Sequence, residues 1–410
     1  MRRMLRNMDA ADIDARLPDT YPMERAKACP LDPPPAYGRF RAERPITRIT
    51  LDFDGGEVWL VTRYEDARTI LGDPRFSSDF STPGFPARLT ARPPGPGTFI
   101  RMDPPDHSRL RRMLQPEFTR RRVEALRPAI DGIVTKLVDD MASRTPPVDL
   151  VDALALPLPS MVITELLGVP YEDREYFHET TKVIGNQSVD PRRRIQVRDD
   201  LKTYLDKLVA AKEAEPADDL LSRLGERREA AGVSREEVVG IATLLMVAGY
   251  ETIANQIGAG TVALLENPER IAELRADPAK LPAAVEEIIR HQTVIDYGLR
   301  RAATADVEVG GRLIRKGDGV VVVVASANRD ESVFECPDRL DFDREQHDHF
   351  SFGYGLHQCM GQILARAQLE AVWSTLFDRI PGLRLAIPVD EVKFRFDMFV
   401  YGVHELPVTW

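Results

Sequence analysis

Cys359 lies in the segment His349–Glu370, HFSFGYGLHQCMGQILARAQLE. Gly353 and Gly355 precede the cysteine in a stretch without helical or strand periodicity, and glycine tolerates positive φ angles and close backbone approach. From Met360 onward, apolar residues recur at helical spacing, at Leu369, Val372, Trp373 and Leu376. The cysteine is therefore expected where a glycine-rich loop enters a helix, whose free amides favour a thiolate. An anionic sulfur on such a loop suits a flat metal cofactor with a single protein ligand, and haem is the candidate.

A single cysteine is also commonly a small buried hydrophobic residue, so the sulfur alone does not establish a metal ligand. Four residues of the segment fit the pattern Phe-x-x-Gly-x-x-x-Cys-x-Gly: Phe352, Gly355, Cys359 and Gly361. With this pattern the chain resembles the cytochrome P-450 family of haem-thiolate monooxygenases. The resemblance implies haem b with Cys359 as the ligand of its iron, and it places Phe352, Gly353 and Gly361 beside the cofactor.

The composition is that of a globular protein with a large core. Of the 410 residues, 43% are hydrophobic and 29% are charged, and no linker, low-complexity tract or repeat divides the chain. The net charge of −10 argues against nucleic acid as the main partner. Three scattered cysteines, no secretory leader, and apolar runs shorter than the ~20 residues of a membrane span predict a cytoplasmic protein without a membrane anchor. Together with the resemblance, these features predict a monomer with one mostly helical α+β domain over residues 1–410, small β-sheets and the cytochrome P-450 fold.

A basic helix is predicted directly after the two prolines at 104–105. On it His107 and Arg111 are four residues apart and share a face. The resemblance assigns both residues, together with Arg301, to the carboxylates of the haem, to which they can donate charge-assisted hydrogen bonds. Arg300 is an alternative to Arg301. A solvated basic face is the alternative for the helix, because further arginines crowd this region: Arg109, Arg112, Arg120, Arg121 and Arg122.

The longest predicted helix starts at Ser234, which can form a capping box with Glu237, and ends before Pro268. Each glycine inside a helix lowers helix stability by about 1 kcal/mol relative to alanine. Repeated glycines therefore indicate positions where close packing requires a small residue. This helix contains four of them: Gly240, Gly249, Gly258 and Gly260.

The middle of this helix reads Ala248-Gly249-Tyr250-Glu251-Thr252, which resembles the family motif that lies over the haem face opposite the sulfur. Small residues at Ala248 and Gly249 would leave room there for dioxygen and substrate. Breaking the O–O bond to release water takes two protons. We therefore predict that the Thr252 hydroxyl donates a hydrogen bond to the distal oxygen and that the Glu251 carboxylate relays protons. The alternative for Thr252 is a hydrogen bond back to the carbonyl four residues earlier. Tyr250 departs from the histidine that is frequent in related bacterial members.

Glu287 and Arg290 stand three residues apart on a further predicted helix. The spacing alone is a weak signal, because exposed Glu/Arg pairs are common and contribute little to stability. At this place in the chain it matches the Glu-x-x-Arg motif of the family, and the resemblance assigns Arg339 as the third member of a buried triad. We expect the triad to support the cysteine loop.

The remaining elements are read from periodicity and turn residues. Strands are predicted at 46–51 and 57–62 as a hairpin, at 307–309, 312–315 and 320–324, and in the tail at 394–410; helices are predicted at 64–71 and 148–167. The loop at 80–97 is long enough to be a substrate entrance, although a plain surface connector is equally compatible with it. By resemblance, residues 171–200 form a lid over the pocket.

The predicted reaction inserts one oxygen atom from dioxygen into a C–H bond or double bond of a small, bulky and apolar molecule, such as a macrolide, a sterol-like compound, another polyketide or a foreign compound. The chain has no flavin or iron–sulfur motif, so the resemblance implies that NAD(P)H supplies electrons through a ferredoxin reductase and a ferredoxin. Two alternatives stay open: a peroxide-driven peroxygenase of the same fold and a non-enzymatic haem sensor or carrier. Neither needs the Glu251–Thr252 pair.

Overall fold

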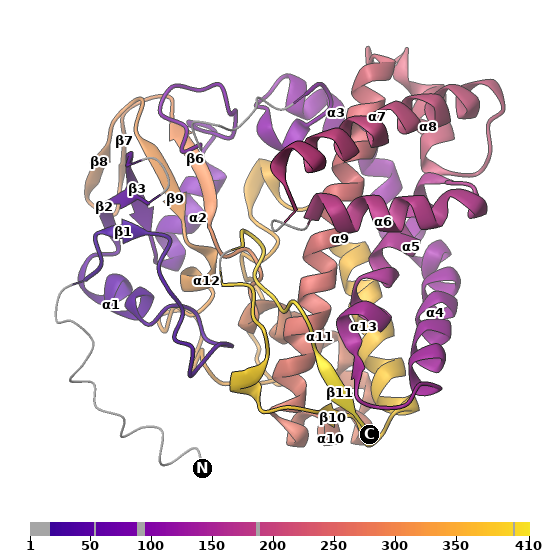
Figure 1. Ribbon diagram of the computed structural model, residues 1–410. Helices are drawn as coiled ribbons and strands as arrows, with labels where there is room; N and C mark the ends of the chain where they lie inside the picture. Colours follow the sequence, from indigo (N-terminus) through magenta and orange to yellow (C-terminus); the bar gives the residue numbers. More distant parts are fainter. Residues whose placement is uncertain (1–16, 53–54, 88–94, 186–188, 397) are drawn as a thin grey trace.

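A long central helix organises the helical half of the molecule. The computed structural model describes residues 17–52, 55–87, 95–185, 189–396 and 398–410. Helix α9 (Arg235–Leu265) runs through the middle of the helical half and packs against neighbours on several sides (Figure 1). These neighbours are α5 (Pro157–Leu167), α6 (Arg174–Gly185), α7 (Pro191–Ala214), α8 (Leu220–Arg228), α10 (Pro268–Ala276), α11 (Leu281–His291) and α13 (Gln362–Arg379). Helix α4 (Arg120–Ala142) covers α13 and α5, and α3 (Asp106–Leu114) contacts α8.

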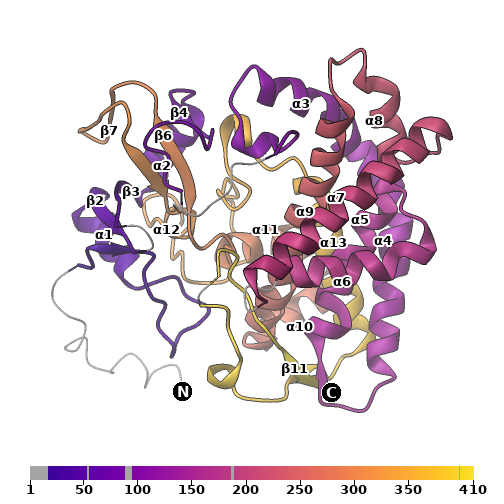
Figure 2. The ribbon, with the colours of Figure 1, turned by 45° about the horizontal axis from the view of Figure 1, so that its top comes forward.

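A mixed sheet lies on the opposite side of the molecule from α4 and α5 (Figure 2). Its strand order is β1 (Thr20–Tyr21), β2 (Ile46–Leu51), β3 (Glu57–Val61), β9 (Gly319–Val322), β6 (Leu299–Ala303) and β4 (Phe76–Ser77). Helices α1 (Ala36–Glu43), α2 (Tyr64–Gly72) and α12 (Val324–Ala327) accompany this sheet. Two smaller sheets pair β10 (Arg384–Leu385), β11 (Pro407–Thr409) and β5 (Val148–Asp149), and β7 (Val307–Val309) with β8 (Arg312–Ile314).

Most predicted elements are present, and the differences follow from local chemistry. The hairpin of β2 and β3 pairs Ile46 with Val61, as its alternating pattern predicts. The helix predicted at 148–167 is interrupted: β5 and a π-helical turn at Val151–Ala155 come first, and α5 begins only at Pro157. Proline lacks the N–H that a helix interior needs, so it favours a helix start. Among the described residues of the predicted strand-rich tail at 394–410, β11 is the only strand, beside isolated bridges at Phe394, Val400 and Val403. Residues 88–94 of the predicted entrance loop lie outside the described residues.

The predicted capping box and the packing reasons for the glycines are both present in α9. Ser234 accepts a hydrogen bond from the Glu237 backbone, and the Glu237 side chain accepts one from the Ser234 backbone. A Cβ on Gly258 would lie 2.7 Å from Val403, and one on Gly260 would meet Ile288 and Trp373. The glycines therefore let neighbouring segments approach the core helix closely.

Helix α9 also has the length and apolarity of a membrane span, with a mean hydropathy of 1.4 over its most apolar window. These properties are shared by the core helices of globular proteins. Since α9 packs against helices from many parts of the chain, its apolar residues serve the protein core here.

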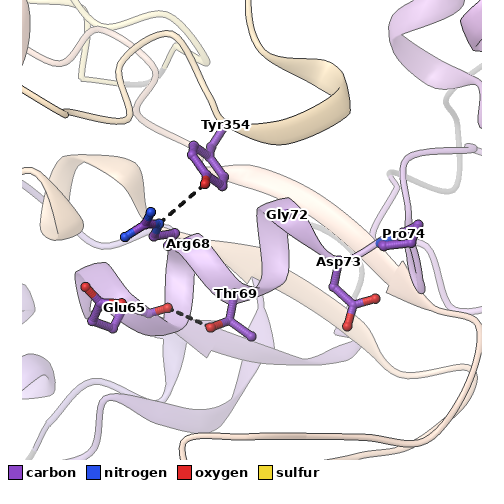
Figure 3. Close-up of a pocket in the computed structure, with 7 residues that line it drawn as sticks. All are labelled: Glu65, Arg68, Thr69, Gly72, Asp73, Pro74 and Tyr354. Carbon is purple, nitrogen blue, oxygen red and sulfur yellow. Dashed lines mark hydrogen bonds between the residues drawn. The ribbon is translucent and has the colours of Figure 1, made fainter.

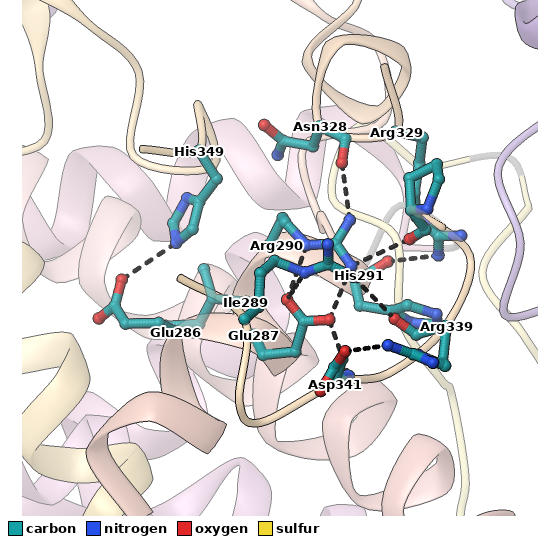
Figure 4. A network of polar contacts seen from close by, with 12 residues as sticks. Glu286, Glu287, Ile289, Arg290, His291, Asn328, Arg329, Arg339, Asp341 and His349 are labelled. Carbon is teal, nitrogen blue, oxygen red and sulfur yellow. Dashed lines mark hydrogen bonds and ion pairs between the residues drawn. The ribbon is translucent and has the colours of Figure 1, made fainter. Parts of the chain in front are cut away.

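The predicted triad is present with one different member. Glu287 and Arg290 are buried, and both guanidinium nitrogens that face Glu287 bind its carboxylate, at 2.7 and 2.8 Å (Figure 4). The third member is Arg344, whose Nε lies 3.0 Å from Glu287. Arg339 was the wrong choice: its side chain is 63% exposed and pairs with Asp341 instead.

The network joins α11 to the segment that leads into the cysteine loop. Arg290 donates to the carbonyls of Asn328 and Pro337, and Arg344 donates to that of Glu335. Asn328 in turn accepts from the backbone N–H of Phe350, at 2.7 Å. A buried carboxylate thus fixes the start of the loop by way of two arginines and an asparagine.

Replacing Arg344 with leucine is expected to destabilise the protein by about 3 kcal/mol, because a buried carboxylate then loses one of its two charged partners. The matched control is Arg339→Leu, which removes an exposed arginine five residues earlier and should leave the unfolding midpoint unchanged. Denaturant unfolding followed by circular dichroism measures both. Equal midpoints for the two variants would contradict the assignment of Arg344 to the triad.

Candidate functional site

The loop before Cys359 is shaped by two glycines with positive φ. Gly353 has φ +71° and Gly355 has φ +72°, which is the left-handed region that other residues rarely adopt. A Cβ on Gly355 would also collide with the backbone carbonyl of Leu71 at the end of α2. The loop closes through a 2.7 Å hydrogen bond from the Cys359 N–H to the Phe352 carbonyl. Cys359 thus lies at the end of a tight loop, directly before Gly361 caps α13.

The sulfur of Cys359 faces space that the protein does not fill. The residue lies deep in the molecule, and yet its side chain is exposed. Burial raises the pKa of the thiol, while the Gly361 N–H and the positive charges of Arg111 and Arg366 act in the opposite direction. No atom lies within 4 Å of where a Cβ on Gly361 would be, so the backbone there borders open space too. A large group can therefore lie against the sulfur, and a metal bound to it would displace the thiol proton.

The residues of the predicted motif on α9 do not all face the same side of the helix. Ala248 is exposed in a helix whose following residues 253–264 are buried, so it also faces unfilled space. A Cβ on Gly249 would lie 3.1 Å from Ile163, so this glycine serves the packing of α9 against α5. Thr252 Oγ1 donates a 2.8 Å hydrogen bond to the Ala248 carbonyl. This is the back-bonded alternative, and the predicted donor role of Thr252 is wrong for this arrangement because its proton is engaged; the oxygen can still accept a hydrogen bond.

Glu251 is held by a residue that the sequence did not indicate. Arg395 Nη2 lies 2.8 Å from the Glu251 carboxylate, and Arg395 Nη1 donates to Asn255 one turn further along α9. Burial raises the pKa of Glu251, and the charge and hydrogen bond of Arg395 partly oppose this. Glu251 is thus a partly buried carboxylate with one cationic partner. Arg395 lies in the tail 144 residues away, and no spacing rule connects the two.

His107, Arg111 and Arg301, which the resemblance assigns to the haem carboxylates, come together in one cluster that carries positive charge on its arginines. Arg101 and His357 belong to the same cluster and were not predicted. The His107 and His357 rings lie 4.2 Å apart. Within the described part of the chain, no carboxylate forms an ion pair with any of the three arginines. Arg300 donates to the Pro86 carbonyl at 3.1 Å and its charge adds to burial in lowering the pKa of Arg101, whereas Arg301 is itself buried.

Asp103 is an acidic neighbour whose charge acts on Arg301 and His107, but it accepts hydrogen bonds from Ser77 and Ser78 and forms no ion pair with the arginines of the cluster. Burial and the nearby Arg301 lower the pKa of His357 to about 3, and burial and Arg101 lower the pKa of Arg301 to about 10. Both ring nitrogens of His107 and Nδ1 of His357 are buried without a hydrogen-bond partner among the described residues. Buried cations and orphaned nitrogens of this kind indicate a bound anionic group. The two carboxylates of a haem fit this set of donors.

A separate surface groove of about 580 Å³ lies outside this site (Figure 3). It is lined by Glu65, Arg68, Thr69, Gly72, Asp73, Pro74 and Tyr354. Tyr354 belongs to the cysteine loop and its hydroxyl accepts a 3.4 Å hydrogen bond from Arg68. None of the predicted site residues lines this groove, so it marks the outer side of the loop and not the candidate site.

The predicted basic face of α3 and α4 is partly neutralised. Arg109 pairs with Asp106 and Glu237. Arg122 lies 3.9 Å from Asp218. The exposed arginines of the face without an ion pair among the described residues are Arg112, Arg120 and Arg121.

Comparison with known proteins identifies the family of the chain. The family model for cytochrome P450 matches residues 44–380. Cytochrome P450 105A3 of Streptomyces carbophilus is 47% identical over 394 residues, which cover 95% of both chains, and a vitamin D3 dihydroxylase of Streptomyces griseolus is 44% identical, over 94% of this chain and 95% of its own. The crystal structure of MycCI, a mycinamicin VIII C21 methyl hydroxylase of Micromonospora griseorubida bound to mycinamicin VIII, is similar with a TM-score of 0.87 and 41% identity, over 95% of this chain and all of that one. The predicted fold is confirmed: the chain belongs to the cytochrome P450 family and is an oxygen-incorporating haem-thiolate oxidoreductase.

Proposed function

We propose that residues 1–410 form one monooxygenase domain that inserts an oxygen atom into a bulky apolar substrate. The observation that carries the proposal is the joint presence of an exposed thiol at the end of a glycine loop and a buried cluster of arginines and histidines whose arginines form no ion pair with a carboxylate of the described residues. Haem would supply the iron that activates dioxygen, and Cys359 would hold that iron as a thiolate ligand.

The chain's own residues would hold the cofactor from two sides. The positive cluster binds its carboxylates: His107, Arg111 and Arg301, with Arg101 and His357 in support. Phe352, Gly353 and Gly361 lie along the loop that carries the sulfur and border the cofactor. Ala248 provides open space on α9 beside it, and the absence of a side chain on Gly249 lets α9 approach α5.

Thr252 and Glu251 would control protons. With its own proton donated to the Ala248 carbonyl, Thr252 Oγ1 is an acceptor and could hold a water molecule in place. Glu251 is partly buried and has a raised pKa, so it takes up a proton at a higher pH than a solvated carboxylate does. Release of the Arg395 ion pair would let Glu251 carry that proton inward through water.

The substrate is proposed to be a macrolide, a sterol-like compound, another polyketide or a foreign compound. Two relatives are named for vitamin D3 and mycinamicin VIII, which supports a bulky molecule. Leu244 and Leu245 lie one turn before Ala248 on the same side of α9, and both are only partly buried. Phe399 in the tail is 40% exposed and contacts the ring of Tyr297. An apolar wall built from these side chains would favour such a substrate.

Electrons are proposed to come from NAD(P)H through a separate ferredoxin reductase and ferredoxin, with the enzyme acting as a cytoplasmic monomer. An acidic ferredoxin needs a basic surface, and Arg112, Arg120 and Arg121 are the exposed arginines that provide it. The net charge of −10 does not oppose this, because association depends on the local field.

Thr252→Ala should reduce product formation at least about tenfold while NADPH consumption continues, because reduced oxygen then escapes as peroxide instead of being inserted. The matched control is Thr243→Ala on the same helix, since Thr243 donates an equivalent 2.8 Å hydrogen bond to the Val239 carbonyl. Product and NADPH are measured in one reaction with surrogate redox partners. Unchanged product formation by Thr252→Ala would refute the assigned role of Thr252.

Arg112→Glu should slow ferredoxin-dependent reduction about tenfold at low salt, because reversing an exposed charge weakens the encounter with an acidic partner. Stopped-flow reduction at low and high ionic strength measures this, and the difference between the variants should shrink as salt screens the surface. Arg384→Glu, an exposed arginine on β10, is the control. Identical rates for Arg112→Glu and the unmodified protein at low salt would exclude this docking face.

A further inference from the structure

Arg366 lies on α13, seven residues after Cys359, and is held in one orientation. Its Nη2 lies 3.0 Å from one carboxylate oxygen of Glu286 on α11, and its Nε binds the other. Its Nη1 donates to Gln362 Oε1 at 3.0 Å. A guanidinium bound to both oxygens of a carboxylate has a fixed plane as well as a fixed position.

The guanidinium lies over the ring of Phe352. The distance from its central carbon to the ring centroid is 4.5 Å, which is within the range of a cation–π interaction. Phe352 is also the residue whose carbonyl accepts the hydrogen bond of the Cys359 N–H. The charge of Arg366 favours the thiolate form of Cys359. One arginine therefore acts on the cysteine loop through packing and through its charge.

Glu286 is an ionised anchor for this arginine. It accepts a second hydrogen bond from His349 Nε2, at 3.1 Å (Figure 4). Burial alone would raise its pKa, but the hydrogen bonds of His349 and Arg366 lower the pKa to about 2. The carboxylate is therefore charged at neutral pH and binds both the first residue of the loop segment and the arginine on the helix that follows it.

We propose that Arg366 is a positioning residue that fixes Phe352 beside Cys359 and whose positive charge raises the reduction potential of the haem. The inference rests on the proposed ligation of iron by Cys359. A positive charge near the thiolate weakens its donation to the iron and disfavours the more positive ferric state. The negative charge of Glu286 partly cancels the effect of Arg366 on the reduction potential.

The charges of the pair predict opposite shifts for its two members. Arg366→Gln removes the positive charge while its amide can still donate to Glu286, so the equilibrium constant for ferric reduction should fall about tenfold, equal to about 59 mV for one electron. Glu286→Gln leaves Arg366 charged without its counter-ion, so the potential should rise. A purely structural link between α11 and α13 predicts that both substitutions, which weaken the same contact, shift the potential in the same direction or not at all.

The test is a spectroelectrochemical titration of the haem-loaded protein, with the absorbance of the ferrous carbonyl complex recorded for each variant. Arg366→Lys, which keeps the charge, should retain a potential close to that of the unmodified protein. The control for loss of an arginine is Arg379→Leu. Arg379 lies on the same helix, about 20 residues beyond the cysteine, and pairs with Asp139.

Shifts of opposite sign for Arg366→Gln and Glu286→Gln support the proposal. If Arg366→Gln does not fold, the rise in potential of Glu286→Gln and the unchanged value of Arg366→Lys still decide the outcome. Shifts of the same sign, or no shift, overturn it while leaving the monooxygenase assignment intact. An unmodified protein whose carbonyl complex lacks the band of thiolate ligation would remove both this inference and the assignment of Cys359.

Discussion

Two neighbouring carboxylates on α11 fix the loop that presents the sulfur, and the candidate site depends on them. Glu287 binds Arg290 and Arg344 in the protein interior, while Glu286 binds His349 and Arg366 nearer the surface. Through these contacts the segment before Cys359 and the helix after it are held to the same helix. Buried charged groups of this kind add little net stability but are costly to break, so they specify one arrangement of the loop.

The opposite constraint acts at the positive cluster, whose arginines form no ion pair with a carboxylate among the described residues. Burial lowers the pKa values of Arg101, Arg111 and Arg301, and the charge of Arg101 lowers that of Arg301 further, so these buried charges are costly. A haem with two carboxylates would offset this cost and could satisfy the nitrogens of His107 and His357. Cofactor binding should therefore contribute to the stability of the folded state, and the open space at Cys359, Gly361 and Ala248 is part of the same arrangement.

Local chemistry made the core of the site predictable from the sequence. The glycines around Cys359 and the capping box of α9 each have a short-range physical reason, and the structure contains both. The motif at 248–252 differs from its prediction, because Thr252 is bonded back to Ala248 and Gly249 packs against α5. The choice between Arg339 and Arg344 could not be made in this way, because both lie in one loop and only the turn between them decides which side chain points inward. Arg395 reaches Glu251 because the tail passes beside α9. His357 and Arg101 reach the positive cluster because their two loops meet β6, which carries Arg301. Such partners are set by tertiary contacts and leave no periodicity in the sequence.

The ligand role of Cys359 is the claim on which the account depends most. Absorbance of the ferrous carbonyl complex of the purified, haem-loaded protein tests it directly, because thiolate ligation shifts the main band to the red. The account predicts this red-shifted band in the unmodified protein and its loss in Cys359→Ser. A carbonyl complex of the unmodified protein without the red-shifted band, or the same band in Cys359→Ser, would contradict it.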